Sequence, residues 1–327
     1  MTTTVNFPLY RGCLDEYGSF EAAIASMRPF GVDGFELIWG DNKYQGELPT
    51  EDLVPGYHLV FWPDWVDFWR GDEEALLRKF GNPAVIREYY GGESRSDMLR
   101  QYTEDMERAA RFGAEYVVFH VSDVSIEEGY SYHWLHSDEE VIEAACELLS
   151  TLTEGRSWPF KILLENQWWP GLSFKNSRLT RRVLESVNGD RGLLLDTGHL
   201  MNGNTNLRTE QDGIAYIHRI LDDMGELAEE IHGIHLHKSL SGEYVKRHTG
   251  FVPALPEDYM QRYSENYAHI LSIDRHAPWT EPKIGTVIDR LKPEFLTNEL
   301  AAGTRREREG VLAVQSQTLK KAGIFRK

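Results

Sequence analysis

Short apolar segments recur along this 327-residue chain, and amphipathic segments separate most of them. Each apolar segment is bounded by turn-forming or polar residues, a pattern typical of buried β-strands. The pattern predicts eight strands, at residues 5–12, 34–40, 56–62, 114–121, 160–166, 191–199, 231–238 and 294–300.

Segments with helical periodicity follow the first predicted strand and precede each of the last five, and several end at glycine, as helices often do. Only the link between the second and third strands is too short for a full helix. Strands that alternate with helices form parallel βαβ units, and eight units predict a closed (β/α)8 TIM barrel. We expect a single domain over residues 1–327, because no linker divides the chain. An open doubly wound sheet is the alternative, but the Gly-rich phosphate loop that it often carries is missing after the first strand.

The connections after the third and seventh predicted strands are long and rich in aromatic residues. One runs from Trp62 to about Met98 and includes most of FWPDWVDFWRG, and the other runs from Ser239 to about Ser272. Long βα loops usually shape the active site of a barrel. We therefore expect a lid over a small, largely organic ligand.

Charge and composition narrow the classes of partner. The formal charge of −17 argues against non-specific attraction to nucleic acid or to an anionic membrane. No apolar segment approaches membrane-spanning length, and the first residues lack the features of a signal peptide. Two cysteines, Cys13 and Cys146, are too few for a Cys-based metal motif or a disulfide framework. These features predict a cytoplasmic protein that acts on a small molecule, and they leave a homodimer open.

Acidic and histidine side chains stand at the ends of six consecutive predicted strands. In a parallel barrel all these ends lie on one face, where the chemistry of such folds is found. A single residue of this kind is more often a hydrogen-bonded core residue than a ligand. The whole set, however, predicts a site for a divalent cation. Imidazole and carboxylate ligands together suit Zn, Mn, Fe or Co, and carboxylate-rich sets also accept Mg. The set comprises His58, His120, Glu165, Asp196, His199, His235, His237 and Glu299.

Aromatic residues follow one of these positions directly. Trp168 and Trp169 come just after Glu165 and form either ordinary packing or an apolar wall against a substrate. Tyr132 and Trp134 leave the same two alternatives open. The chain has no GxSxG, HExxH or Walker-type motif.

The motifs LLENQ, LLLDTGH, IHLHKS and TNEL resemble those of the xylose isomerase-like TIM-barrel superfamily. This superfamily includes endonuclease IV and the sugar isomerases and epimerases related to tagatose and psicose 3-epimerase. The resemblance covers the motifs of strands three to eight. Its epimerase branch implies one divalent metal (Mn, Mg, Co or Zn), held by Glu165, Asp196, His235 and Glu299. On strand seven, His237 is the alternative to His235.

The endonuclease IV branch implies a cluster of up to three zinc ions. The DNA-inserting loops of that branch are not recognisable here. Its additional ligands map to His58, His120, His199, Asp274 and His276.

The resemblance favours a metal-dependent isomerase or epimerase of a sugar or sugar phosphate. The metal would stabilise an enediolate, while Glu165 and Glu299 would transfer protons on opposite faces of the substrate. An endonuclease IV-like multi-zinc phosphodiesterase is the alternative, and a non-catalytic binding barrel is a third class. The residues expected to contact a sugar-like substrate are His199, Trp168, Trp169, Lys238 and Trp62.

Overall fold

The computed structural model describes residues 1–40 and 44–325, and its centre is a closed barrel of eight parallel strands in chain order. Strand β1 pairs with both β2 and β8, which closes the barrel. The predicted TIM-barrel fold is therefore confirmed. The strands are β1 (Thr2–Leu9), β2 (Gly34–Trp39), β3 (Gly56–His58), β4 (Tyr116–His120), β5 (Lys161–Glu165), β6 (Arg191–Asp196), β7 (Ile231–His235) and β8 (Phe295–Asn298).

Strand β1 begins three residues earlier than the sequence pattern predicts. The predicted strand begins at Val5, but Thr3 and Thr4 before it are also buried. The hydroxyl of Thr4 lies 3.1 Å from the Tyr116 hydroxyl and 2.9 Å from that of Thr297. Hydrogen bonding inside the barrel thus removes the cost of burying these polar side chains.

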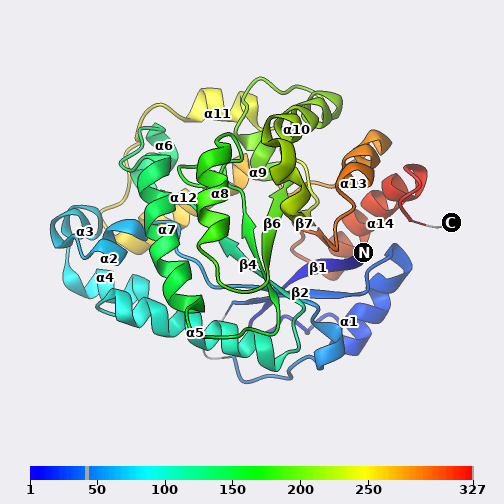
Figure 1. Ribbon diagram of the computed structural model, residues 1–327, viewed down its shortest axis with the longest axis horizontal. Helices are drawn as coiled ribbons and strands as arrows, with labels where there is room; N and C mark the ends of the chain where they lie inside the picture. The colour runs from blue at the N-terminus through cyan, green and yellow to red at the C-terminus, as the bar shows by residue number, and fades with distance from the viewer. Residues whose placement is uncertain (41–43, 326–327) are drawn as a thin grey trace.

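Helices form a layer around the barrel, with α7 and α8 side by side outside the central strands (Figure 1). Helix α14 packs against α1, so the layer closes where the two ends of the chain meet. The helices of this layer are α1 (Phe20–Met27), α5 (Arg95–Arg111), α7 (Asp138–Thr153), α8 (Ser177–Glu185), α10 (Glu210–Met224), α13 (Gly285–Leu291) and α14 (Arg305–Lys321). Four 3-10 helices accompany them among the described residues: η1 (Arg28–Phe30), η2 (Glu51–Leu53), η3 (Gly225–Glu230) and η4 (Pro282–Ile284).

The βα connections carry the remaining helices, all on the side of the barrel where the strands end. The long connection after β3 holds three short helices, and the one after β7 holds two. No helix in residues 1–40 or 44–325 is both long and apolar enough to cross a membrane. The helices of the connections are α2 (Val66–Arg70), α3 (Glu73–Phe80), α4 (Pro83–Tyr90), α6 (Ile126–Ser131), α9 (Thr197–Asn202), α11 (Gly242–His248) and α12 (Tyr259–Ile273).

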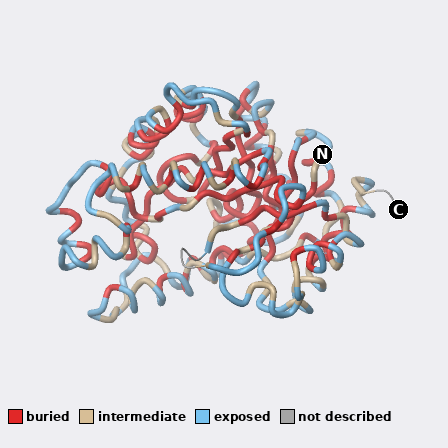
Figure 2. Tube along the Cα trace, turned by 90° about the horizontal axis from the view of Figure 1, so that it is seen from below, coloured by how far each residue is buried: buried red, intermediate tan, exposed pale blue. Residues whose placement is uncertain are grey.

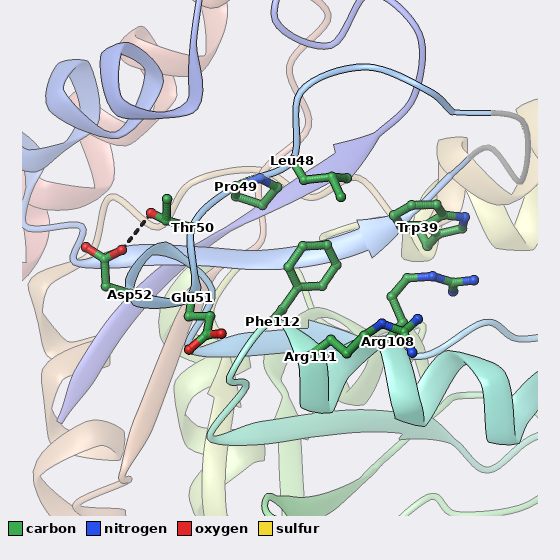
Figure 3. Close-up of a pocket in the computed structure, with 9 residues that line it drawn as sticks. All are labelled: Trp39, Leu48, Pro49, Thr50, Glu51, Asp52, Arg108, Arg111 and Phe112. Carbon is green, nitrogen blue, oxygen red and sulfur yellow. Dashed lines mark hydrogen bonds between the residues drawn. The ribbon is translucent and has the colours of Figure 1, made fainter.

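The link between β2 and β3 contains only η2 within its described part, as its short length predicts. A cavity of about 800 Å³ lies beside this link, on the outside of the barrel against α5 (Figure 3). Its lining includes Trp39, Leu48, Arg108 and Phe112. None of the acidic and histidine residues predicted for the metal site lines it.

A buried network of charges attaches the connection after β3 to the connection after β4. The Nζ atom of Lys79 lies 2.7 Å from carboxylate oxygens of both Asp64 and Asp67. His136 lies 3.1 Å from Asp67 and 3.8 Å from Asp123. Because buried charges are costly unless they are paired, this network fixes how the two connections pack.

Buried residues concentrate in the barrel strands, and exposed residues lie on the outer faces of the helices (Figure 2). Inside the barrel, the rings of Tyr116 and Phe295 pack with centroids 4.3 Å apart. Above them, Glu36 accepts hydrogen bonds of 2.8 Å from the hydroxyls of Tyr116 and Thr297. This filled interior supports the side chains at the strand ends from below.

Candidate metal centre

The register of the barrel brings the predicted metal ligands together at the ends of the strands. His120 and Glu165 are partners across β4 and β5, and Asp196 and His235 are partners across β6 and β7. Glu299 directly follows β8. Three adjoining groups of side chains result, and within each group the candidate ligand atoms lie within 4.8 Å of one another.

The first group consists of His58, His120 and Glu165. His58 Nδ1 donates to the carbonyl of Leu59 at 2.9 Å, which leaves Nε2 with a lone pair. This Nε2 lies 3.0 Å from His120 Nε2, and His120 Nε2 lies 2.7 Å from Glu165 Oε2. Two imidazoles and one carboxylate thus converge, as in a three-ligand zinc site.

The second group consists of Glu165, Asp196, His235 and Glu299. His235 Nδ1 lies 3.0 Å from Glu299 Oε2, 3.3 Å from Glu165 Oε1 and 3.7 Å from Asp196 Oδ2. Glu165 belongs to both the first and second groups, with one carboxylate oxygen toward each. The one side chain can therefore offer a ligand atom to each group.

Glu36 is a site residue that the sequence reasoning missed. It lies in the middle of β2 and is fully buried. Its Oε2 accepts from His235 Nε2 at 3.0 Å, so that Nδ1 of the same ring faces the second group. A carboxylate behind a ligand histidine fixes the orientation and tautomer of its ring. The signal in the sequence was an acid inside the otherwise apolar segment GFELIW.

Replacing Glu36 by glutamine is expected to weaken cation binding about 10–100-fold, because the ring of His235 loses its charged carboxylate acceptor while the side-chain volume is kept. Titration of the metal-free protein with zinc, followed by calorimetry, measures this affinity. Glu51→Gln changes an exposed acid in η2 and is the matched control. Unchanged affinity in the Glu36 variant would contradict the orienting role.

The third group consists of His199, His237, Asp274 and His276. His199 Nδ1 donates to the carbonyl of Asn166 at 3.1 Å, which leaves Nε2 facing Asp274 Oδ2 at 3.1 Å. His276 Nε2 lies 3.3 Å from the same Asp274 oxygen. The sequence separated these residues by up to 77 positions, and helix α9 and the segment after α12 bring them together.

His276 has a backbone conformation that is rare for residues other than glycine. Its φ is +44°, in the left-handed region. Such a conformation costs about 1–3 kcal/mol and persists where the surroundings require it, which is often at functional sites. The conformation is consistent with a side chain held in place for binding.

Several buried polar atoms of the three groups make no well-aligned hydrogen bond within the described residues. They are both carboxylate oxygens of Glu165, Glu299 Oε2, and the Nδ1 atoms of His235 and His237. An unsatisfied buried polar group costs about 1–3 kcal/mol, so native proteins rarely keep several together. Divalent cations would satisfy these atoms, and imidazole with carboxylate is a donor set that zinc accepts. The residues present therefore fit a metal centre.

Charges within the centre shift the protonation of its members. Burial opposes the charge on Glu165, but the imidazoles of His120 and His235 outweigh it and hold the pKa of that carboxyl well below its usual value. Burial opposes the charge on His276 as well, but Asp274 and a further carboxylate raise its pKa to about 10. Because a histidine must lose its proton to bind a metal, cation binding is expected to release protons.

Aromatic side chains flank the first and third groups. Phe61 packs on the ring of His120 with centroids 4.2 Å apart, although 43% of Phe61 is exposed. Trp168 packs on His199 with centroids 5.0 Å apart and on Trp169 with centroids 4.1 Å apart. The indole N–H groups of both tryptophans have no hydrogen-bond partner among the described residues. The placement of Trp168 and Trp169 agrees with an aromatic wall beside the centre.

Two residues predicted to contact substrate, Trp62 and Lys238, form contacts with other side chains and backbone groups of the protein. Trp62 is buried, donates from Nε1 to the carbonyl of Tyr89 at 3.2 Å and packs on Tyr102. Lys238 forms a close ion pair with Glu210. Their contacts favour structural roles, and Phe61, next to Trp62 in sequence, faces the centre instead.

The geometry defines a TIM barrel with buried clusters of histidine and carboxylate side chains, suited to metal binding, at the carboxyl ends of its strands. The family model described as xylose isomerase-like TIM barrel matches residues 24–292, and the chain belongs to this family. Members of the family include enzymes. A comparison of the sequence with curated proteins gives no significant match.

Solved structures with the same fold cover almost the whole chain at low identity. A putative xylose isomerase from Rhodospirillum rubrum is 14% identical, with a TM-score of 0.53 over 99% of this chain and 98% of that one. An L-ribulose 3-epimerase is 11% identical, with a TM-score of 0.51 over 99% and 94%. Endonuclease IV from Thermus thermophilus is 15% identical, with a TM-score of 0.50 over 98% and 100%. At these identities the likeness extends to the fold alone.

Proposed function

We propose that the protein is a multinuclear, metal-dependent hydrolase of phosphate esters. The observation that carries the proposal is the set of three adjoining ligand groups, two of which share Glu165. One cation needs only one group. The remaining ligands, in the first and third groups, have a chemical purpose if further cations are bound. Two-metal and three-metal sites are suited to displacement at phosphorus, where charge develops on several oxygens.

The environment of Glu165 supports a bridging role. Its side chain is fully buried, and histidine nitrogens surround it at 2.7 Å (His120), 3.1 Å (His199), 3.3 Å (His235) and 3.7 Å (His58). The pKa of this carboxyl is held well below its usual value. A residue so placed holds cations well and accepts protons poorly.

When bound, divalent cations supply positive charge for phosphate oxygens and lower the pKa of water at the site. The protein's side chains would hold the cations and the ester in position. Glu165 belongs to both the first and the second group, and Glu36 orients the ring of His235. Phe61 and Trp168 would pack on the organic part of the ester and exclude bulk water.

A sugar or sugar-phosphate isomerase or epimerase is the second candidate. The second group alone, with two glutamates around Asp196 and His235, provides the ligand set that a one-metal enediolate mechanism would use. That mechanism also needs Glu165 as a proton carrier next to a C–H bond. Its complete burial among four imidazoles makes this role less suitable than bridging.

We place the substrate among small phosphate esters, including sugar phosphates, rather than nucleic acids. The formal charge of −17 opposes a polyanion, while a small ester needs only the cations and the aromatic wall. A homodimer is compatible with this proposal.

The test is to purify the protein without chelators and measure metals per chain, phosphoester hydrolysis and ketose chemistry together. Two or three equivalents, mainly zinc, with hydrolysis of bis(p-nitrophenyl) phosphate and small phosphate esters would support the proposal. One equivalent, with solvent deuterium entering a ketose, would favour the isomerase instead. Cleavage of abasic DNA with a steep salt dependence would contradict the substrate class.

Chelation is expected to remove both activity and stability. Without cations, Glu165 and its neighbouring carboxylates face one another in a buried site, and each lost cation removes about 2.7 kcal/mol if it was present at 100 times its Kd. Thermal denaturation before and after dialysis against EDTA measures this loss, and zinc should restore hydrolysis and the original midpoint. An unchanged midpoint with unchanged turnover would argue against a metal centre.

A further inference from the structure

We propose that the third group holds its cation as a closed, structural site, and that His237 is the ligand that closes it. The inference rests on the proposed function, because it divides the cations between structural and catalytic roles. Structural zinc sites have four protein ligands, whereas catalytic sites have three and keep one position for water or substrate. The third group, with His237, offers four side chains, and the first group offers three.

The members of the third group are arranged to give one ligand atom each. Asp274 Oδ1 accepts hydrogen bonds from Asn202 Nδ2 at 3.1 Å and from the Ser239 hydroxyl at 3.2 Å. Only Oδ2 is left to face His199 and His276. The ring of each of these histidines donates from Nδ1 to a backbone carbonyl, which leaves Nε2 for a cation. Three single-atom ligands then require a fourth to complete a tetrahedron.

His237 is fixed in place by the backbone around it. Its N–H donates to the hydroxyl of Thr197 at 3.2 Å, and its carbonyl accepts from Trp279 Nε1 at 2.9 Å. The ring lies directly against Gly198, where an added Cβ would sit 1.9 Å from the ring carbon Cε1. Only glycine at position 198 leaves room for the imidazole, so the segment DTGH both supplies His199 and makes space for His237.

The ring of His237 faces the other members of the group. Its centroid is 4.2 Å from that of His276, nearly parallel, and 5.8 Å from that of His199. The side chain is fully buried, and its Nδ1 has no hydrogen-bond partner within the described residues. Its Nε2 lies 2.9 Å from Asp196 Oδ2. A ring that only supported Asp196 would leave the third group with three ligands, the same number as the first.

The test compares His237→Asn and His237→Gln with the unsubstituted protein. Both amides keep a donor toward Asp196 but are poor zinc ligands, so they separate binding from support. We expect each variant to lose one zinc equivalent, or to bind it at least about 100-fold more weakly, and to melt at a lower temperature. His232→Asn, in the preceding strand β7 with its side chain 27% exposed, is the matched control. His120→Asn, in the first group, should lose hydrolysis but keep the zinc ion of the third group.

The outcomes separate this inference from the proposed function. Full zinc stoichiometry and affinity in both His237 variants would overturn the closed site while leaving a multinuclear hydrolase intact. A melting temperature equal to that of the His232 control would overturn the structural role. A single equivalent in the unsubstituted protein would overturn the proposed function, and this inference with it.

Discussion

Replacing Glu165 by glutamine is expected to lower phosphoester hydrolysis at least about 1,000-fold and to reduce the zinc content of the protein. The substitution removes the carboxylate that the first and second groups share. A catalytic cation supplies several kcal/mol of transition-state stabilisation, and each 1.36 kcal/mol corresponds to a factor of ten in rate. Steady-state kinetics and elemental analysis on the same preparation measure both effects.

Glu185→Gln, at the exposed end of α8, is the matched control and should retain full activity and metal. The pattern of losses also separates the two candidate functions. Loss of turnover with full retention of metal would indicate that Glu165 acts as a proton carrier, as an isomerase requires. Loss of turnover together with metal would indicate bridging. Full turnover in the variant would contradict both mechanisms.

The order of the strands and the polar residues near their ends could be predicted from local sequence, because both depend on local patterns, although the predicted strands end one to four residues later than the observed ones. The segment LLLDTGH combines a buried strand with Asp196 as the N-cap of α9, where its Oδ1 accepts from the His199 N–H at 2.6 Å. Parallel topology then places all strand ends on one face without further information. For this reason the sequence alone could suggest which residues meet, although it could not show that they form three groups.

The side chains that support the centre could not be predicted, because their roles depend on contacts between distant segments. Glu36 lies in mid-strand and has its role only because His235, 199 residues later, lies beside it. Lys238 was predicted to contact substrate, because the sequence gives no sign that it pairs with Glu210 of α10, 28 residues earlier. Phe61 and Trp62 are adjacent in the sequence but have different surroundings. Because β3 ends at His58, the alternation of side chains along a strand could not predict which of the two faces the centre.

A second large effect is expected outside the three ligand groups, on stability. Replacing Lys79 by methionine should destabilise the protein by about 3–5 kcal/mol at pH 8, because it leaves buried carboxylates without their cation. Burial opposes the charge on Lys79, but Asp64 and Asp123 outweigh it and raise the pKa of the ammonium above its usual value. Burial raises the pKa of Asp64 to about 7 even with Lys79 beside it.

The sign of the pH dependence follows from these shifts. The folded-state pKa of Asp64, about 7, lies above its usual value of 3.8, so this group favours folding at low pH and its contribution is lost as pH rises toward 7. Asp67, with a pKa lowered to about 2 by His136 and Lys79 against burial, contributes stability that is present above pH 4 and lost toward pH 2. Without Lys79 the carboxyls take up protons more readily, so the loss should be smaller at pH 5 than at pH 8.

Urea denaturation of the Lys79 variant at pH 5 and pH 8 measures this difference. Lys320→Met, on the exposed face of α14, is the matched control and should change stability by less than about 0.5 kcal/mol. Adding Asp64→Asn to the Lys79 variant should recover part of the loss, because it removes one of the uncompensated charges. If the loss is equal at both pH values, or if Asp64→Asn recovers nothing, then packing of the lysine stem rather than charge compensation holds the connections after β3 and β4 together.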